Sequence, residues 1–115
     1  YISAHGTGTA LNDVSETKAI KLALGEQANH VAVSATKSMV GHLLGGAGAL
    51  GVFSCVKAIT EEVIPPTINL QSPATDCDLD YVPLNARESK VNYALTNGFG
   101  FGGQNGCVLI GKYQN

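Results

Sequence analysis

The sequence predicts a single α/β domain over residues 1–115, with helices packed on a mixed sheet. Segments with strand and helix patterns alternate along the chain in the order β-α-β-α-β-β, and this alternation favours parallel strands joined by helical crossovers. Hydrophobic residues make up 44% of the chain and charged residues 14%, a balance typical of a folded core and not of a disordered segment. The 14 glycines follow no repeat, so they indicate turns and close backbone contacts.

The first strand and helix are predicted before residue 25. Residues 1–4 have the apolar character of a strand end, and a glycine-rich loop follows them. Asp13 and Glu16 have the spacing of a capping box, which predicts a helix that begins at Asn12 or Asp13. Gly25 is a favourable residue for the end of that helix.

The middle of the chain predicts a second strand and a buried helix. Residues 31–36 are β-branched and apolar, as in a strand, and residues 37–41 are expected to form a loop. From residue 43 to 62 the chain is apolar on nearly every face, which predicts a helix that is buried all round. Its several glycines predict that another backbone packs close against it.

The last third predicts two strands after a long irregular segment. Pro65 and Pro66 end the helix, and the irregular segment extends to Arg87. Apolar side chains then alternate with others from residue 91 to 96, which is a strand pattern. After a glycine-dense loop at 97–103, residues 107–110 predict a buried final strand, antiparallel to the preceding one.

Composition excludes several classes of protein. The net charge of −2 and the absence of a basic cluster argue against a nucleic-acid partner. No apolar run is long enough for a membrane span. Three cysteines without regular spacing argue against a disulfide scaffold and for a reducing compartment. Because the chain lacks an initiator methionine and opens directly on a strand, we expect it to be a piece of a longer protein.

The motifs allow more than one interpretation when each is taken alone. Two G-x-G-x-x-G runs, at 46–51 and 98–103, lack the strand-before and helix-after context of a dinucleotide site. The histidines and cysteines lack metal-ligand spacing, and His30 lies in a turn typical of the surface. His5 and His42 adjoin glycine-rich loops just beyond strands, where open α/β sheets place ligand sites. Spacing alone nevertheless favours buried, hydrogen-bonded histidines over catalytic ones.

The order of the loop motifs is more informative than any one of them. They are Ala4-His5-Gly6-Thr7-Gly8-Thr9, Thr36-Lys37-Ser38-Met39-Val40-Gly41-His42, Pro65-Pro66-Thr67-Ile68-Asn69-Leu70, Cys77-Asp78-Leu79-Asp80-Tyr81-Val82-Pro83 and Asn97-Gly98-Phe99-Gly100-Phe101-Gly102-Gly103. Together they resemble the C-terminal part of a β-ketoacyl-acyl-carrier-protein synthase, over essentially the whole chain. The resemblance implies a thiolase-like fold, here an incomplete C-terminal half with helices on a mixed sheet and its last two strands antiparallel.

The resemblance implies a role for three polar residues. His5 and His42 match the family's two catalytic histidines, whose neutral rings present N–H groups to the malonyl thioester carbonyl as CO2 leaves. Lys37 matches a loop lysine that positions and polarises the His42 side. On these matches we predict that His5, Lys37, His42 and Phe101 converge in space. The alternative for Lys37 is an ordinary solvated loop charge.

Four further residues match family positions around the substrate. Thr7 and Thr9 match threonines that bind the pantetheine arm, although they could simply satisfy loop backbone groups. Phe99 and Phe101 match the gate, and the backbone N–H of Phe101 matches an oxyanion donor. The alternative is that both phenylalanines are core aromatics.

Two departures from the family pattern concern charge and the nucleophile. The family's nucleophilic cysteine stands at a helix N-terminus in the other half of the fold, so we expect none of Cys55, Cys77 and Cys107 to be the nucleophile. Many family members carry an acidic residue at the position of Gly51, and its lack leaves the charge balance of Lys37 open.

The resemblance implies a cytoplasmic, homodimeric acyltransferase of fatty-acid elongation that uses acyl and malonyl groups on acyl carrier protein. No metal or cofactor is expected beyond the carrier's phosphopantetheine. The alternatives are a polyketide ketosynthase and a non-catalytic chain-length-determining partner subunit. We also expect a missing central strand between the strands of Ile2 and Leu95, and therefore a piece that is inactive and unstable alone.

Overall fold

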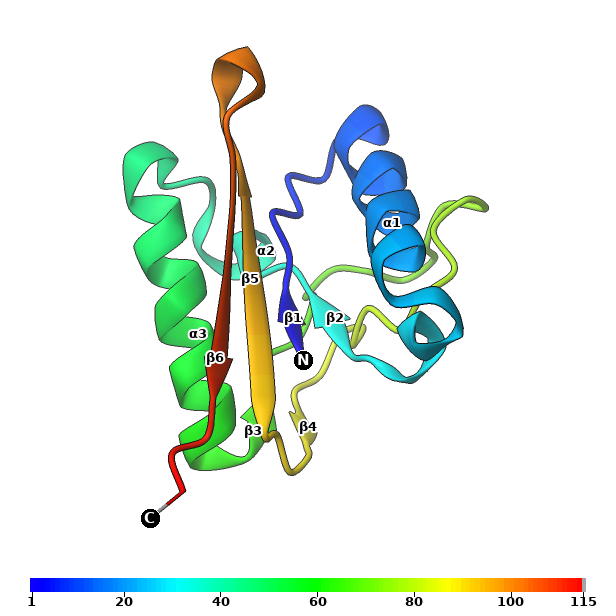
Figure 1. Cartoon of the computed structure of the whole chain (residues 1–115). Coiled ribbons are helices and arrows are strands. Elements are labelled where there is room, and N and C mark those ends of the chain that lie inside the picture. Colours follow the sequence, from blue (N-terminus) through cyan, green and yellow to red (C-terminus); the bar gives the residue numbers. More distant parts are fainter. Residues whose placement is uncertain (115) are drawn as a thin grey trace.

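Six strands form two sheets in the computed structural model, which describes residues 1–114 (Figure 1). The larger sheet has the order β2-β1-β5-β6, in which β1 runs parallel to β2 and β5, and β5 runs antiparallel to β6. The mixed α/β architecture and its antiparallel last pair are therefore as predicted. The strands are β1 (Ile2–Ser3), β2 (Val33–Ser34), β5 (Tyr93–Phe99) and β6 (Asn105–Gly111), with β3 (Val63–Ile64) and β4 (Arg87–Glu88) forming a separate antiparallel pair.

Strands β1 and β5 are direct neighbours, so the expectation of a missing central strand between them is wrong. Ile2 is in register with Val33 on one side and with Leu95 on the other, and the Leu95 N–H donates to the Tyr1 carbonyl at 2.9 Å. Lateral strand order depends on tertiary packing, which alternation along the chain does not specify. The argument from two unpaired inner edges therefore fails. Within residues 1–114 the outer edge of β6 has no partner strand.

Helix α1 (Ala10–Leu24) begins earlier than predicted because Thr9, and not Asp13, caps it. The Thr9 hydroxyl accepts the Asn12 N–H at 3.2 Å, and Gly25 ends the helix with φ of 58°, as predicted. A 3-10 helix η1 (Gly25–His30) follows. The predicted loop after β2 contains one helical turn, α2 (Lys37–Val40).

Helix α3 (Ala47–Glu61) is buried on one face only, so the prediction of burial all round is wrong for the described residues. It is preceded by η2 (Leu44–Gly46) and packs on β1 and β5 through the residues Gly51, Ser54, Cys55, Ala58 and Ile59. On the opposite face Phe53 is 60% exposed. A Cβ built at Gly51 would lie 2.2 Å from Thr96 Oγ1, whereas Gly45 and Gly48 face open space. Of the glycines in this segment, only Gly51 is required by a close contact. The contact is with the side chain of Thr96 and not with another backbone, as had been predicted.

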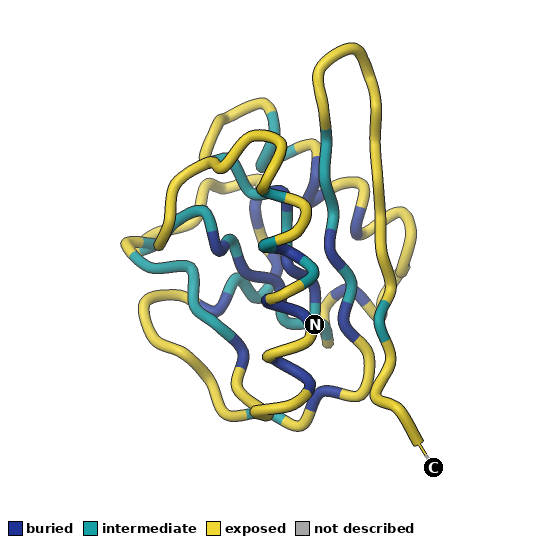
Figure 2. Tube along the Cα trace, turned by 90° about the vertical axis from the view of Figure 1, so that its left-hand side faces the viewer, coloured by how far each residue is buried: buried dark blue, intermediate teal, exposed yellow. Residues whose placement is uncertain are grey.

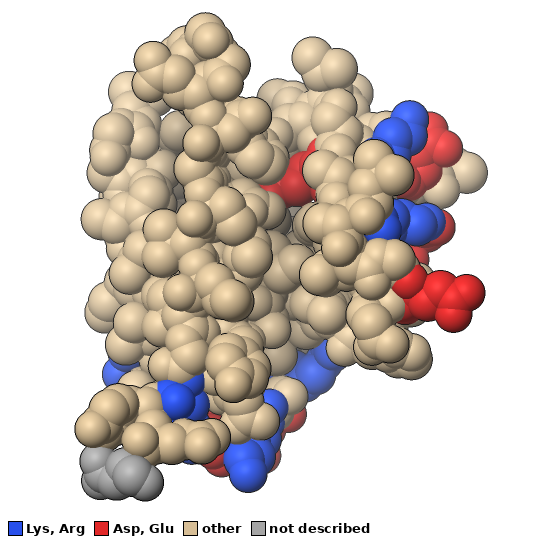
Figure 3. All heavy atoms as spheres, viewed as in Figure 1, with Lys and Arg blue, Asp and Glu red and all other residues tan. Residues whose placement is uncertain are grey.

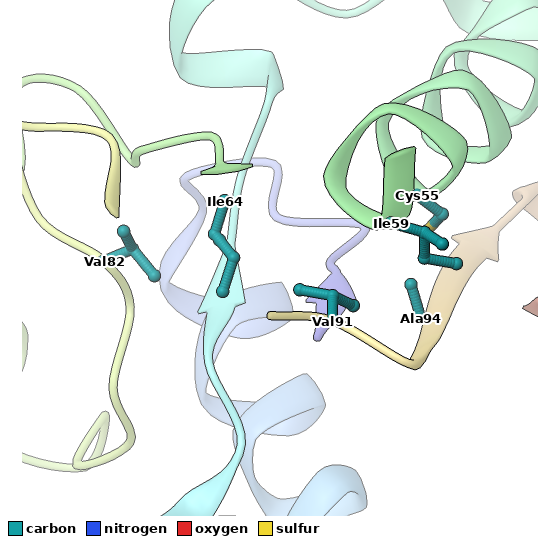
Figure 4. Packing of buried hydrophobic residues seen from close by; sticks show 6 residues of the cluster. All are labelled: Cys55, Ile59, Ile64, Val82, Val91 and Ala94. Carbon is teal, nitrogen blue, oxygen red and sulfur yellow. The ribbon is translucent and has the colours of Figure 1, made fainter. Parts of the chain in front are cut away.

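Two apolar clusters hold the layers together. One joins α3, β3, β5 and the long irregular segment through Cys55, Ile59, Ile64, Val82, Val91 and Ala94 (Figure 4). The other lies between α1 and the strands β1 and β2, and Leu79 of the irregular segment completes it. Burial is concentrated there, whereas the β6 arm is exposed (Figure 2). Leu109 on β6 is 67% exposed, so the expected buried last strand is wrong, because nothing in residues 1–114 covers it.

Candidate active site

The carboxyl ends of β1, β2 and β5 meet at one edge of the sheet, and the residues that follow them line a cavity of about 680 Å³. The sheet order places the loops after these strands side by side, although they are far apart in sequence. Lining residues include His5, Thr7, Lys37, His42, Phe99 and Phe101. The structure therefore brings the matched residues to one cavity. A hollow beside β5 with acidic atoms at its base is visible between β5 and α1 (Figure 3).

His5 is held from several directions. It is 8% exposed, and its backbone N–H donates to the Glu16 carboxylate at 2.9 Å. Its Nδ1 accepts the Phe99 N–H at 3.4 Å, and the Phe99 ring lies 5.3 Å from the imidazole. Burial lowers the pKa of His5, and the nearby Lys37 ammonium lowers it further, against the opposing effect of Glu16. The imidazole is therefore neutral near pH 7.

His42 faces His5 from an exposed loop. The ring centroids are 5.7 Å apart and the planes meet at 84°. The Nδ1 of His42 accepts the Leu44 N–H at 2.9 Å, so this ring too is anchored through Nδ1. In a neutral imidazole one nitrogen accepts and the other carries the proton. Because Nδ1 is the acceptor in each ring, Nε2 is the nitrogen left to donate.

Lys37 is bonded to the first histidine. Its ammonium donates to the His5 carbonyl, which links α2 to the loop after β1. Desolvation lowers the pKa of Lys37, and the Glu16 carboxylate partly offsets this shift. With no acidic side chain at Gly51, Glu16 is the carboxylate that compensates this charge. The open charge balance of Lys37 thus has a structural answer.

The two threonines line the cavity and bond to each other. The Thr7 and Thr9 hydroxyls are 3.0 Å apart, and Thr9 also caps α1. The capping bond gives Thr9 the backbone role that sequence reasoning held as its alternative, and pantetheine binding stays a prediction for both residues. The Phe101 ring is 96% exposed at the hairpin tip, in η3 (Phe101–Gly103), so Phe99 is the phenylalanine packed on His5.

Glu16 and Asn97 belong to the site, and sequence reasoning missed their part in it. The sequence predicts a capping box that includes Glu16, but the Glu16 carboxylate bonds to the backbone after β1 and to the Asn97 amide at 3.1 Å. A signal was available, because Glu16 falls on the same buried helical face as Thr17 and Ile20. A carboxylate on such a face requires specific partners.

None of the three cysteines lines the cavity that holds His5 and His42. Cys55 is buried within α3, where desolvation raises the pKa of its thiol, the opposite of what activates a nucleophile. Cys77 is buried in the irregular segment, and Cys107 is exposed on β6. His30 is exposed, as expected. Over residues 1–114 no group of three or more His, Cys, Asp or Glu could hold a metal ion, and no helix there is long and apolar enough to cross a membrane.

Comparisons with known proteins converge on one family. Residues 1–71 match the C-terminal domain of beta-ketoacyl synthases. The chain is 57% identical to 3-oxoacyl-[acyl-carrier-protein] synthase 2 of Synechocystis sp.. The match covers 99% of this chain and 27% of that relative. It is 53% identical to a Streptomyces coelicolor protein named "Actinorhodin polyketide putative beta-ketoacyl synthase 1", over 96% of the chain and 24% of the relative. The chain thus spans about a quarter of these relatives.

A solved structure agrees with the sequence matches. The structure is of a type II PKS acyl-carrier protein in complex with its ketosynthase bound to the hexaketide. It superposes with a TM-score of 0.96 at 39% identity, over 99% of this chain and 28% of that one. The thiolase-like architecture predicted from the loop motifs is therefore confirmed.

Proposed function

Because the chain belongs to the beta-ketoacyl synthase family, as its match to the family's C-terminal domain shows, we propose that its parent protein is a 3-oxoacyl-[acyl-carrier-protein] synthase. The proposed reaction joins an acyl group, held as a cysteine thioester in the other half of the parent, to malonyl on acyl carrier protein. The observation that carries the proposal is the pair of imidazole rings, whose centroids are 5.7 Å apart and which are each anchored through Nδ1.

The two Nε2–H groups suit the first step, in which the malonyl C–C bond breaks and CO2 leaves. Negative charge develops on the thioester oxygen as the enolate forms, and two N–H donors stabilise it there. The enolate carbon then attacks the acyl thioester carbonyl. A new C–C bond forms, the C–S bond breaks, and the cysteine leaves as a thiolate. The low pKa of His5 keeps its ring a neutral donor, because burial disfavours the imidazolium.

The carrier protein is the proposed partner, and its phosphopantetheine arm enters as part of the substrate. Thr7 and Thr9, which line the cavity, are proposed to bind that arm. Phe99 and Phe101 are proposed as the gate, with the exposed Phe101 hairpin as its moving part. We propose a homodimer in the cytoplasm for the parent, in keeping with the family resemblance.

Fatty-acid elongation is favoured over polyketide synthesis by the presence of both Phe99 and Phe101. This preference rests on the family resemblance, which implies that polyketide ketosynthases tend to lack a phenylalanine at the position of Phe99. A chain-length-determining partner subunit, the non-catalytic alternative, needs neither the nucleophile nor two anchored imidazoles. The identity of the residue at the nucleophile position in the parent distinguishes these two classes.

The deciding experiment incubates the purified intact parent with acyl carrier protein charged with a saturated acyl chain and with malonyl carrier protein. Release of CO2 in equal amount to a product two carbons longer supports the proposal. Extension through several unreduced ketone units indicates a polyketide synthase. No CO2 release by the parent alone indicates the partner subunit. Residues 1–115 expressed alone are expected to be inactive, and turnover by that piece contradicts this expectation.

A further inference from the structure

Glu16 is a buried carboxylate that the proposed chemistry does not use. It is 4% exposed, although it lies on α1 and not on the catalytic loops. Its Oε1 accepts the His5 N–H and its Oε2 accepts the Gly6 N–H, both at 2.9 Å. A buried carboxylate that bonds to two backbone N–H groups holds them in place, because a buried carboxylate or N–H group without a hydrogen-bond partner costs free energy.

The same carboxylate also holds strand β5. The Asn97 amide donates to Oε1 at 3.1 Å, and Asn97 precedes Phe99 on that strand. The Phe99 N–H in turn donates to Nδ1 of His5 at 3.4 Å. The contacts form a closed circuit from the His5 loop through α1 to β5 and back to the His5 ring.

We propose that Glu16 is a positioning residue, which keeps the His5 ring aligned for donation from Nε2 by tying the loop after β1 to β5 through Asn97. The inference rests on the proposed condensation for its kinetic effect. The circuit itself stands on geometry. A capping role does not explain the contacts, because Thr9 already caps α1 and the Gly8 N–H is taken by Asp13 at 3.2 Å.

The test uses the intact parent with Glu16→Gln, Asn97→Ala and the double variant. The matched control is Glu26→Gln, which changes an exposed glutamate on η1. Malonyl decarboxylation is measured separately from acyl transfer to the nucleophile. We expect kcat for decarboxylation to fall by about 10- to 100-fold in Glu16→Gln, because small displacements of a reacting group have effects of this order. KM for malonyl carrier protein should change less, and the control should match the wild type.

Asn97→Ala should lower the same kcat by less, since it leaves both backbone bonds to Glu16 intact. The double variant should resemble Glu16→Gln, because two residues that act through one circuit are not additive. A readout free of activity is the ¹⁵N resonance of His5 Nδ1 in histidine-labelled protein. Weakening of the Phe99 N–H bond should move that resonance in both single variants and not in the control.

Unchanged decarboxylation and an unchanged His5 resonance in Glu16→Gln would overturn the proposal. If Glu16→Gln lowers the melting temperature too far to assay, Asn97→Ala decides, and wild-type behaviour of that variant also overturns it. Fully additive losses in the double variant contradict the circuit. If the wild-type parent does not condense, the proposed function fails, and the resonance alone then decides for or against the positioning role.

Discussion

The two histidines of the site are both anchored through Nδ1 but differ in how the fold holds them. His5 is buried, and α1, α2 and β5 each contribute a bond to its backbone or ring. His42 is exposed, and its one hydrogen bond within residues 1–114 comes from the N–H of Leu44, two residues further along the chain. One donor is therefore fixed by tertiary contacts, and the other by a local turn. We therefore expect substitutions in α1, α2 or β5 to affect His5, and substitutions in the neighbouring turn to affect His42.

The largest effect is expected from removing either ring. In the intact parent, His5→Ala and His42→Ala should each lower malonyl decarboxylation by roughly 10²–10³, the effect of losing one oxyanion donor. Acyl transfer to the nucleophile should be affected less. Release of CO2 at the wild-type rate by either variant, measured with labelled malonyl carrier protein, would refute the assignment of that ring.

The glycines beside the two rings should separate the tertiary and local anchors. Gly6 has φ of 44°, and a Cβ there would lie 2.6 Å from the Ala35 Cβ, so Gly6→Ala combines backbone strain with a clash. Gly41 has φ of 73° but faces open space. We expect Gly6→Ala to destabilise the parent by about 2–4 kcal/mol, and Gly41→Ala by about 1–2 kcal/mol. Chemical denaturation measures both, and equal losses would contradict the contrast.

A smaller loss of stability is expected where Gly51 of α3 packs against Thr96 of β5. Gly51→Ala brings a methyl group against Thr96, which should cost about 1–3 kcal/mol of overpacking. Adding Thr96→Ala removes the hydroxyl that clashes, so the double variant should be more stable than the two single losses predict. The matched control is Gly48→Ala, where a Cβ meets nothing and the change should be neutral or stabilising. Additive losses at Gly51 and Thr96 would show that the close contact is unimportant.

The smallest expected effect is on the pH dependence of stability. The pKa of His5 is lowered in the folded protein, mainly by burial, from its ordinary value of 6.5. Below about pH 6.5 the unfolded chain therefore binds more protons at His5 than the folded protein does. Its contribution to stability is full above about pH 6.5 and is lost as pH falls toward the folded pKa. His5→Asn should therefore flatten the loss of stability as the pH falls below about 6.5. A slope identical to that of the wild type in urea titrations would contradict this.

Sequence patterns predicted features formed by neighbouring parts of the chain, and they missed how distant strands pair and which surfaces are covered. Gly25 as a helix end and the antiparallel last pair are local signals, and the structure has both. The pairing of Ile2 with Leu95 and the exposure of Leu109 depend on which layers surround the sheet, and no alternation pattern carries that information. Within the site, the loop motifs brought out the histidines, whereas the part of Glu16 required knowing that α1 faces the loop after β1.

The contact between Gly51 and Thr96 also constrains how this sequence can diverge. Any side chain at position 51 meets the Thr96 hydroxyl, so an acidic residue there requires that position 96 first change to a smaller side chain. The two sites are epistatic, and one order of substitution is open while the reverse order passes through a destabilised intermediate. Among descendants of this sequence, the two positions are therefore expected to covary, and a bulky residue at 51 should rarely be found beside threonine at 96.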